Sequence, residues 1–172
     1  MAWEQGRPAA AEFHRVPAPL VPVFDFVNTL DARSFGGRST SDDLPDWLGE
    51  HTDDEAALAV RLRTALRGLT EANRDGTAAR PAEFDALGAE LPLKARVDGL
   101  APIDTGLRGR LEELLASVVI ATADGSWARM KTCGAPDCQW VFYDHSKPRN
   151  ARWCSTAGCG NRMKTRAYRA RG

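Results

Sequence analysis

Apolar side chains recur every three to four residues through most of the first 124 residues, a spacing that predicts α-helices. The strongest pattern predicts a helix over residues 55–73, with Asp53 as its N-terminal cap and Gly76 just past its end. Four arginines of this helix lie mostly outside its apolar stripe and are expected to form salt bridges: Arg61, Arg63, Arg67 and Arg74. Weaker patterns of the same kind predict further helices over 23–33, 44–51, 81–91 and 105–124.

One short segment of this helical part alternates in the manner of a β-strand. Residues 93–97 place apolar and polar side chains in turn, and the dipeptide Asp98-Gly99 follows them directly. Such a dipeptide favours a two-residue hairpin turn, with 100–103 as the returning strand. A small two-stranded ribbon is therefore predicted between two helices.

Composition divides the chain into three parts. Residues 1–22 are rich in Ala and Pro with little periodicity, which predicts a flexible or extended lead-in. Residues 23–128 are predicted to form a helical domain, and 129–172 a small second domain. Because no Gly- or Ser-rich linker separates these two domains, we expect them to pack against each other.

The last part contains the four cysteines of the chain, in two equally spaced pairs, Cys133-x4-Cys138 and Cys154-x4-Cys159. No signal peptide and no membrane-spanning apolar run is recognisable, so we expect a cytoplasmic protein without membrane contact, with reduced thiols. Four thiolates suit tetrahedral zinc, which predicts one structural Zn²⁺ ion held by these residues. Two disulfides or unligated thiols are the alternatives. His145 is interpreted as a surface residue, since four cysteines already fill the shell.

The segments around the cysteines predict the fold of this unit. Residues 139–144, QWVFYD, are strand formers, and 151–153 are the expected partner strand after a turn. A helix is expected from Met163 onward. The fold class is therefore mainly α, or α+β: a helical N-terminal domain with a small β-hairpin, then a zinc finger resembling a treble clef.

Two motifs resemble a known family. The segments FYDHSKPRNAR and WCSTAGCGNRMKTRAYRAR closely resemble the CGNR zinc finger, named for residues that are Cys159, Gly160, Asn161 and Arg162 here. The segment FDFVNT at 24–29 is similar to the opening of the helical ABATE domain that usually precedes this finger. Family members are bacterial proteins described as stress-induced transcription regulators, with the finger assumed to bind DNA. The resemblance implies that fold, a bound zinc ion and a DNA-binding regulator.

The charge distribution supports a basic interface. Residues 131–172 contain nine Lys/Arg and two Asp/Glu, a net charge of +7, and the rest of the chain carries the opposite −7. A basic end beside a zinc site could neutralise phosphates, in a salt-sensitive way. Alternatively, it docks on the acidic half of its own chain or of a partner subunit. The residues predicted to contact nucleic acid are Arg149, Arg152, Arg162, Lys164, Arg166, Arg169 and Arg171. For Arg162, an ion pair with Asp144 inside the finger is a competing role.

Three polar residues lie in or just after the otherwise apolar first helix: Asn28, Thr29 and Arg33. Since a buried amide must find partners, this group is a candidate binding site for a small-molecule effector. The alternative is that the Asn28 amide pins a loop against the helix.

These features favour a zinc-dependent, DNA-binding transcription regulator whose helical domain senses an effector or forms a homodimer. The alternative is a small-molecule-binding or catalytic helical domain with the finger as a structural clamp. A protein-interaction module is a third interpretation, because a fold does not specify a function. No phosphate-binding loop, nucleophile motif or pair of spaced histidines occurs, so no catalytic residues are assigned and an enzyme is the less favoured class.

Overall fold

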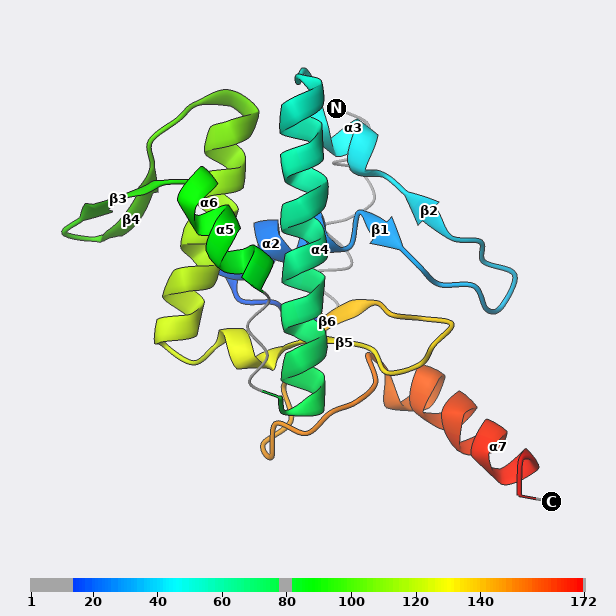
Figure 1. The fold of residues 1–172 in the computed structure, drawn as a ribbon. Coiled ribbons are helices and arrows are strands. Elements are labelled where there is room, and N and C mark those ends of the chain that lie inside the picture. Colours follow the sequence, from blue (N-terminus) through cyan, green and yellow to red (C-terminus); the bar gives the residue numbers. More distant parts are fainter. Residues whose placement is uncertain (1–13, 78–81, 172) are drawn as a thin grey trace.

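Helices dominate the computed structural model, which describes residues 14–77 and 82–171 (Figure 1). The helices of the first domain are η2 (Ala18–Leu20), α2 (Val21–Val27), α3 (Leu44–Leu48), α4 (Asp53–Asp75), α5 (Ala82–Glu90) and α6 (Gly106–Ala123). Helix α4 runs through the middle of the molecule, with α2, α5 and α6 packed against it. The mainly α fold class is thereby confirmed.

Helix α4 is the predicted long helix, with a different cap. The side chain of Thr52 accepts a hydrogen bond from the Glu55 amide, and the Glu55 carboxylate accepts one from the Thr52 amide. This reciprocal pair satisfies amides that the first turn leaves unpaired, so the helix begins at Asp53, not after it. At the other end Gly76 adopts a left-handed φ of 67°, as its predicted position after the helix requires.

The four arginines of α4 have different roles. Arg61, Arg63 and Arg74 form the predicted salt bridges, with Glu83 and Glu90, with Asp42, and with Asp75. Arg67 forms none with the described residues and instead donates to the Val27 and Gln139 carbonyls, so the salt-bridge prediction is wrong for this residue. Both Arg63 and Arg67 are buried.

Residues 18–22 are more ordered than their composition suggests. Within the part of the chain that the structure describes, the first helical turn begins at Ala18, before Val23, and Leu20 is buried at 1% exposure. Residues 18–22 are therefore not an extended lead-in, while residues 1–13 and Pro81 lie outside the described parts of the chain. Helix α2 then ends at Val27, so Leu30 belongs to a short strand and not to the predicted helix.

Three small antiparallel ladders accompany the helices: β1 (Leu30–Asp31) with β2 (Ser41–Asp42), β3 (Leu93–Arg96) with β4 (Gly99–Pro102), and β5 (Met130–Thr132) with β6 (Val141–Tyr143). In the second ladder Arg96 pairs with Gly99, so the turn residues are Val97 and Asp98, one position before the predicted pair. The predicted ribbon is otherwise confirmed.

The finger differs from prediction in its strand pairing. Strand β6 pairs with β5, which precedes the first cysteine, and residues 151–153 form no strand. All three residues of β5 are buried, mostly against α4, and this tertiary packing stabilises a strand too short to be recognised by its pattern. After η3 (Trp127–Arg129), β5 and β6, the chain forms the wide turn η4 (Thr156–Gly160) and α7 (Asn161–Arg169), two residues earlier than predicted.

A single hydrophobic core includes side chains from both domains. Phe24 and Leu66 of the helical part are buried in the same cluster as Met130, Val141 and Phe142 of the finger. The expectation that the two parts pack together is thus confirmed. Across the described residues, no helix is both long and apolar enough to cross a bilayer.

Candidate metal centre

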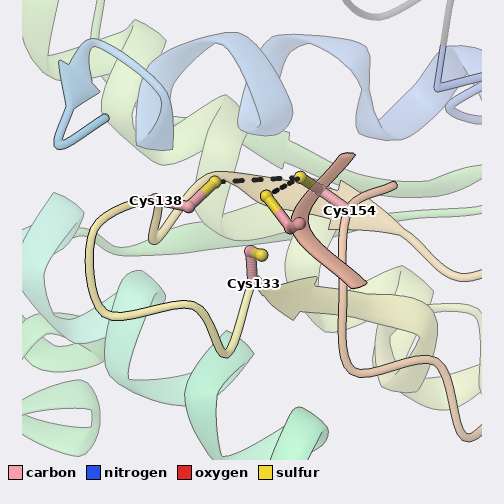
Figure 2. Close-up of side chains that lie close together, drawn as sticks. Cys133, Cys138 and Cys154 are labelled. Atoms are coloured by element: carbon pink, nitrogen blue, oxygen red, sulfur yellow. Dashed lines mark hydrogen bonds between the residues drawn. The ribbon is translucent and has the colours of Figure 1, made fainter. Parts of the chain in front are cut away.

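The four cysteine sulfurs gather at one point of the finger. They all lie within 4.8 Å of one another, and none is in a disulfide. Figure 2 shows the Cys138 and Cys154 sulfurs facing each other, 3.8 Å apart, and the Cys154 and Cys159 sulfurs are 3.7 Å apart. A tetrahedron with zinc–sulfur bonds of about 2.3 Å has sulfur–sulfur edges of about 3.8 Å. The cluster therefore has the size and ligand type of a four-cysteine zinc site.

The first cysteine pair lies in the turn of the β5–β6 hairpin. The Cys133 amide donates to the Trp140 carbonyl at 2.8 Å, and the Cys138 amide donates to the Ala135 carbonyl at 2.9 Å. Gln139 then adopts a left-handed φ of 51°, which returns the chain into β6. The hairpin thus places Cys133 and Cys138 on the same side of the site.

The second pair depends on a tight approach of the backbone to an indole ring. Ser155 accepts hydrogen bonds from the Gly158 amide through its hydroxyl and from the Gly160 amide through its carbonyl, which winds η4 around Cys159. A Cβ atom on Gly160 would lie 3.2 Å from the Trp153 ring. A side chain at this position would therefore require the Trp153 ring to shift by a few tenths of an ångström.

The thiols of the cluster share their protons unequally. Hydrogen bonds from Cys138 and Cys154 lower the pKa of the Cys133 thiol to about 2. Hydrogen bonding to Cys133 raises the pKa of Cys138 to about 12 and also raises that of Cys154. Zinc binds thiolates, so an ion held by all four sulfurs must displace the protons that remain on them. Four protein ligands leave no open position, so a zinc ion held here would be structural.

Arg162 braces the metal site from outside. Its guanidinium donates to Asp137 at 2.7 Å and to the Cys159 sulfur at 3.5 Å, and it lies 3.4 Å above the Phe35 ring. The competing prediction named the wrong carboxylate, because Asp144 is bound elsewhere. These contacts inside the finger favour a structural role for Arg162 over the predicted contact with nucleic acid.

A buried ion pair supports the other side of the finger. The Lys131 ammonium donates to Asp144 at 2.8 Å and to the Arg149 carbonyl at 2.5 Å, with only 3% and 0% of the Lys131 and Asp144 side chains exposed. Burial opposes ionisation of Asp144, but Lys131 and the amides of Ser146 and Ala151 outweigh it and lower the pKa of Asp144 to about 2. The sequence pattern did not predict this pair; the available signal was a lysine next to Met130 in the short segment before Cys133.

The predicted effector site around Asn28 is a structural junction. The Asn28 amide donates to the Val141 carbonyl and accepts from the Val141 amide, both at 3.0 Å, as a neighbouring strand would. The Thr29 hydroxyl donates to the Phe26 carbonyl and accepts from Arg63, both at 2.8 Å. Both side chains are buried with their hydrogen bonds made inside the protein, which favours the alternative of an amide that pins the chain.

Arginines complete the same junction. Arg33 pairs with Asp31 and lies 3.9 Å above the Trp140 ring of the finger. Arg67 donates to a carbonyl at the end of α2 and to the Gln139 carbonyl of the knuckle, both at 2.9 Å. Both guanidinium groups therefore join the two domains, and Arg33 belongs to the junction rather than to a separate binding site.

Replacing Asn28 with alanine is expected to lower the free energy of unfolding by about 2–4 kcal/mol, because the buried Val141 amide and carbonyl both lose their partner. Urea denaturation of zinc-loaded protein measures this change. Thr64→Ala, which removes a hydroxyl bonded to Val60 on the exposed side of α4, is the matched control and should cost under about 1 kcal/mol. An unchanged stability of the Asn28 variant would contradict the junction and restore the effector hypothesis.

The remaining predicted nucleic-acid contacts are exposed. Figure 1 shows α7 extending away from α4 and α6, and residues 164–171 are all exposed. Arg166 shares Asp137 with Arg162, at 3.3 Å, which fixes one side of the helix to the first knuckle. The opposite side presents Lys164, Tyr168 and Arg171. Beyond Met163 the basic helix is therefore not packed on the acidic half of the chain. The side chains of Arg149, Arg152 and Arg169 are also exposed.

Fold and site together define a helical protein with a four-cysteine finger built into its core. Comparison with family models identifies residues 20–128 as ABATE, described as "Putative stress-induced transcription regulator", and residues 129–172 as a CGNR zinc finger. A search of curated proteins finds no match. The ABATE match covers more than half of the chain, so the chain belongs to the ABATE family, with a CGNR zinc finger at its C-terminal end. The family recognised from the two sequence motifs is thus confirmed.

Proposed function

We propose that this protein is a DNA-binding transcription regulator in which α7 lies along the phosphate backbone or in the major groove. One observation carries the proposal: residues 145–171 contain eight Lys/Arg and no Asp/Glu, and five of these cations lie in α7 or directly after it. Arg and Lys contacts to phosphate supply most of the affinity in nucleic-acid binding. The family description of a transcription regulator agrees with this use.

The metal centre would set the direction of the basic helix. Cys159 lies two residues before the start of α7, and Asp137 in the first knuckle binds both Arg162 and Arg166. A zinc ion that joins the two knuckles, in the treble-clef arrangement that we infer, would hold these contacts in place. The outward face with Lys164, Tyr168 and Arg171 could then meet a duplex without rearrangement. Tyr168, at 78% exposure, adds a flat polar ring to this face.

The proposal predicts that the exposed charges of α7 and of the residue pair after it control DNA affinity. Changing Lys164, Arg169 and Arg171 together to glutamine should weaken binding to a mixed genomic duplex by at least tenfold at about 50 mM salt. The slope of log affinity against log salt should become shallower by about 0.9 for each phosphate that the variant no longer neutralises. Fluorescence anisotropy at several salt concentrations, with zinc-loaded protein, measures both quantities.

The control removes equal charge elsewhere. Arg38, Lys94 and Arg96 are exposed residues of the helical part, and their change to glutamine should leave the salt slope as in the parent. If both triple variants weaken binding equally, the interaction is a general charge effect. If the zinc-loaded parent does not bind DNA at low salt, the proposed function fails.

A further inference from the structure

A large pocket opens in the helical domain, away from the metal centre. It has a volume of about 840 Å³ and lies between α2, the end of α3, strand β4 and α6. Pockets for small organic ligands have volumes of about 300–1,000 Å³ and mostly apolar walls. Its apolar lining includes Val21 and Pro22 of α2, Leu100 and Pro102 of β4, and Leu114 and Ile120 of α6. The helical domain thus contains a second candidate site, distinct from the Asn28 junction.

The charged groups of this pocket are predominantly acidic. Among the described residues, Asp46 and Glu113 line it with exposed side chains, next to the partly buried Asp25, and Arg110 is the one cation of this lining. The Arg110 guanidinium lies 4.0 Å above the Trp47 ring and donates to the Trp47 carbonyl at 3.1 Å, so it is used in holding α3 against α6. Acidic groups on apolar walls favour a cation and disfavour an anion of the same shape.

We infer that this pocket binds a small apolar molecule that carries a positive charge, of the class of hydrophobic amines. The apolar walls would cover the hydrocarbon part, and the carboxylates would face the ammonium group. A carboxylate or phosphate ligand would meet repulsion from these same groups. The inference goes beyond the proposed function, because binding in this pocket requires neither the finger nor DNA.

The position of the pocket suits an effector. Val21, Pro22 and Asp25 of α2 line it, and Asn28, which directly follows the same helix, holds strand β6 of the finger. Pocket and finger therefore share one short helix. A ligand that fastens α2 would act on the element to which the metal-binding hairpin is docked.

Three adamantane derivatives test the inference, because they share one hydrocarbon shape and differ only in the polar group. We expect 1-adamantylamine, protonated at pH 7, to bind the zinc-loaded full chain about tenfold more tightly than 1-adamantanol, and adamantane-1-carboxylate to bind more weakly than either. Isothermal titration calorimetry measures the three affinities without DNA. Absence of amine binding at millimolar concentration, or equal binding of the three compounds, would overturn the proposal.

Variants then locate the binding site. Asp46→Asn with Glu113→Gln should reduce the preference for amine over alcohol from about tenfold to about twofold, while alcohol binding stays unchanged. The matched control, Asp54→Asn with Glu71→Gln, removes the same charge from exposed positions of α4 and should keep the preference. Ser117→Trp, which fills the pocket from α6, should abolish binding of all three compounds. A preference that survives in the Asp46/Glu113 variant would place the amine elsewhere and contradict the proposal.

The two proposals fail separately. A protein that binds the amine and not DNA would keep the pocket and lose the proposed regulator. A protein that binds DNA and none of the three adamantane compounds would support the proposed regulator and contradict the inference about the pocket.

Discussion

Replacing Cys154 with serine is expected to reduce the zinc content from about one ion per chain to near zero and to unfold the finger. Three remaining thiolates form an incomplete tetrahedron, and we expect zinc affinity to fall by more than about a hundredfold. The finger, residues 129–172, is too short to bury enough apolar surface to fold without its metal. Elemental analysis and hydrogen exchange of the β5–β6 amides measure the two effects.

The loss of stability should extend from the finger to the helical domain. Met130, Val141 and Phe142 are buried in the common core, with exposures of 0%, 0% and 3%. Each such side chain contributes about 2 kcal/mol by its burial, so an unfolded finger should also lower the melting temperature of the helical domain. Zinc-loaded Ser146→Ala is a control for mutation within the finger and should keep its metal. A chelator-free preparation of the parent with no metal and an ordered finger would contradict this prediction.

Asp144→Asn is expected to lower the free energy of unfolding by about 3–5 kcal/mol, because it leaves the buried Lys131 ammonium without its counter-charge. The matched control is Glu83→Gln, which breaks an ion pair of 2.6 Å with Arg61 on the surface. Exposed pairs contribute about 0–1 kcal/mol, so this variant should unfold almost as the parent does. Denaturant unfolding of zinc-loaded protein compares the two.

A double variant distinguishes the cost of the unpaired Lys131 charge from the cost of the changed side chain at position 144. Lys131→Met with Asp144→Asn removes both charges but keeps a side-chain oxygen for the Ser146 and Ala151 amides, and should recover most of the stability lost in Asp144→Asn alone. If Asp144→Asn costs under about 1 kcal/mol, water must reach the pair and the buried site is not as closed as its exposure indicates.

The stability that this ion pair contributes should decrease at low pH. A carboxyl group with a pKa of about 2 in the folded protein and about 3.9 unfolded stabilises fully above about pH 4, and loses that effect as the pH falls toward 2. The cost of Asp144→Asn should therefore be the same at pH 6 and pH 8. Stability supplied by zinc should instead weaken as the pH falls, because protons compete with the metal for the thiolates.

Local pattern was sufficient for the main helices. The periodic apolar stripe located α4 to within two residues at each end, and similar stripes located α3 and α6. These predictions succeeded because a helix that buries one face repeats that face every 3.6 residues. The metal site was also predicted from the sequence, because zinc ligation depends on residue type and the four cysteines occur as two equally spaced pairs.

Strand pairing in the finger was beyond the reach of local pattern. A strand was predicted within residues 139–144, and Val141–Tyr143 forms it, but its partner was placed at 151–153 and not at Met130–Thr132. A three-residue strand has too few positions to show alternation, and its burial comes from α4, far away in the sequence. The polar side chain of Lys131 inside this strand is explained only by Asp144, which lies across the hairpin.

By itself, the sequence determined the helices, the four sulfur ligands, the basic end and the family, because each depends on neighbouring residues or on residue chemistry. The tertiary structure alone decided which polar groups meet. Asn28 binds Val141, 113 residues away, and Arg162 binds Asp137 instead of Asp144. Such pairings decide whether a polar residue is free for a ligand or used within the fold. They depend on how α2, α4 and the hairpin pack, since burying a polar group is favourable only where that packing supplies a partner.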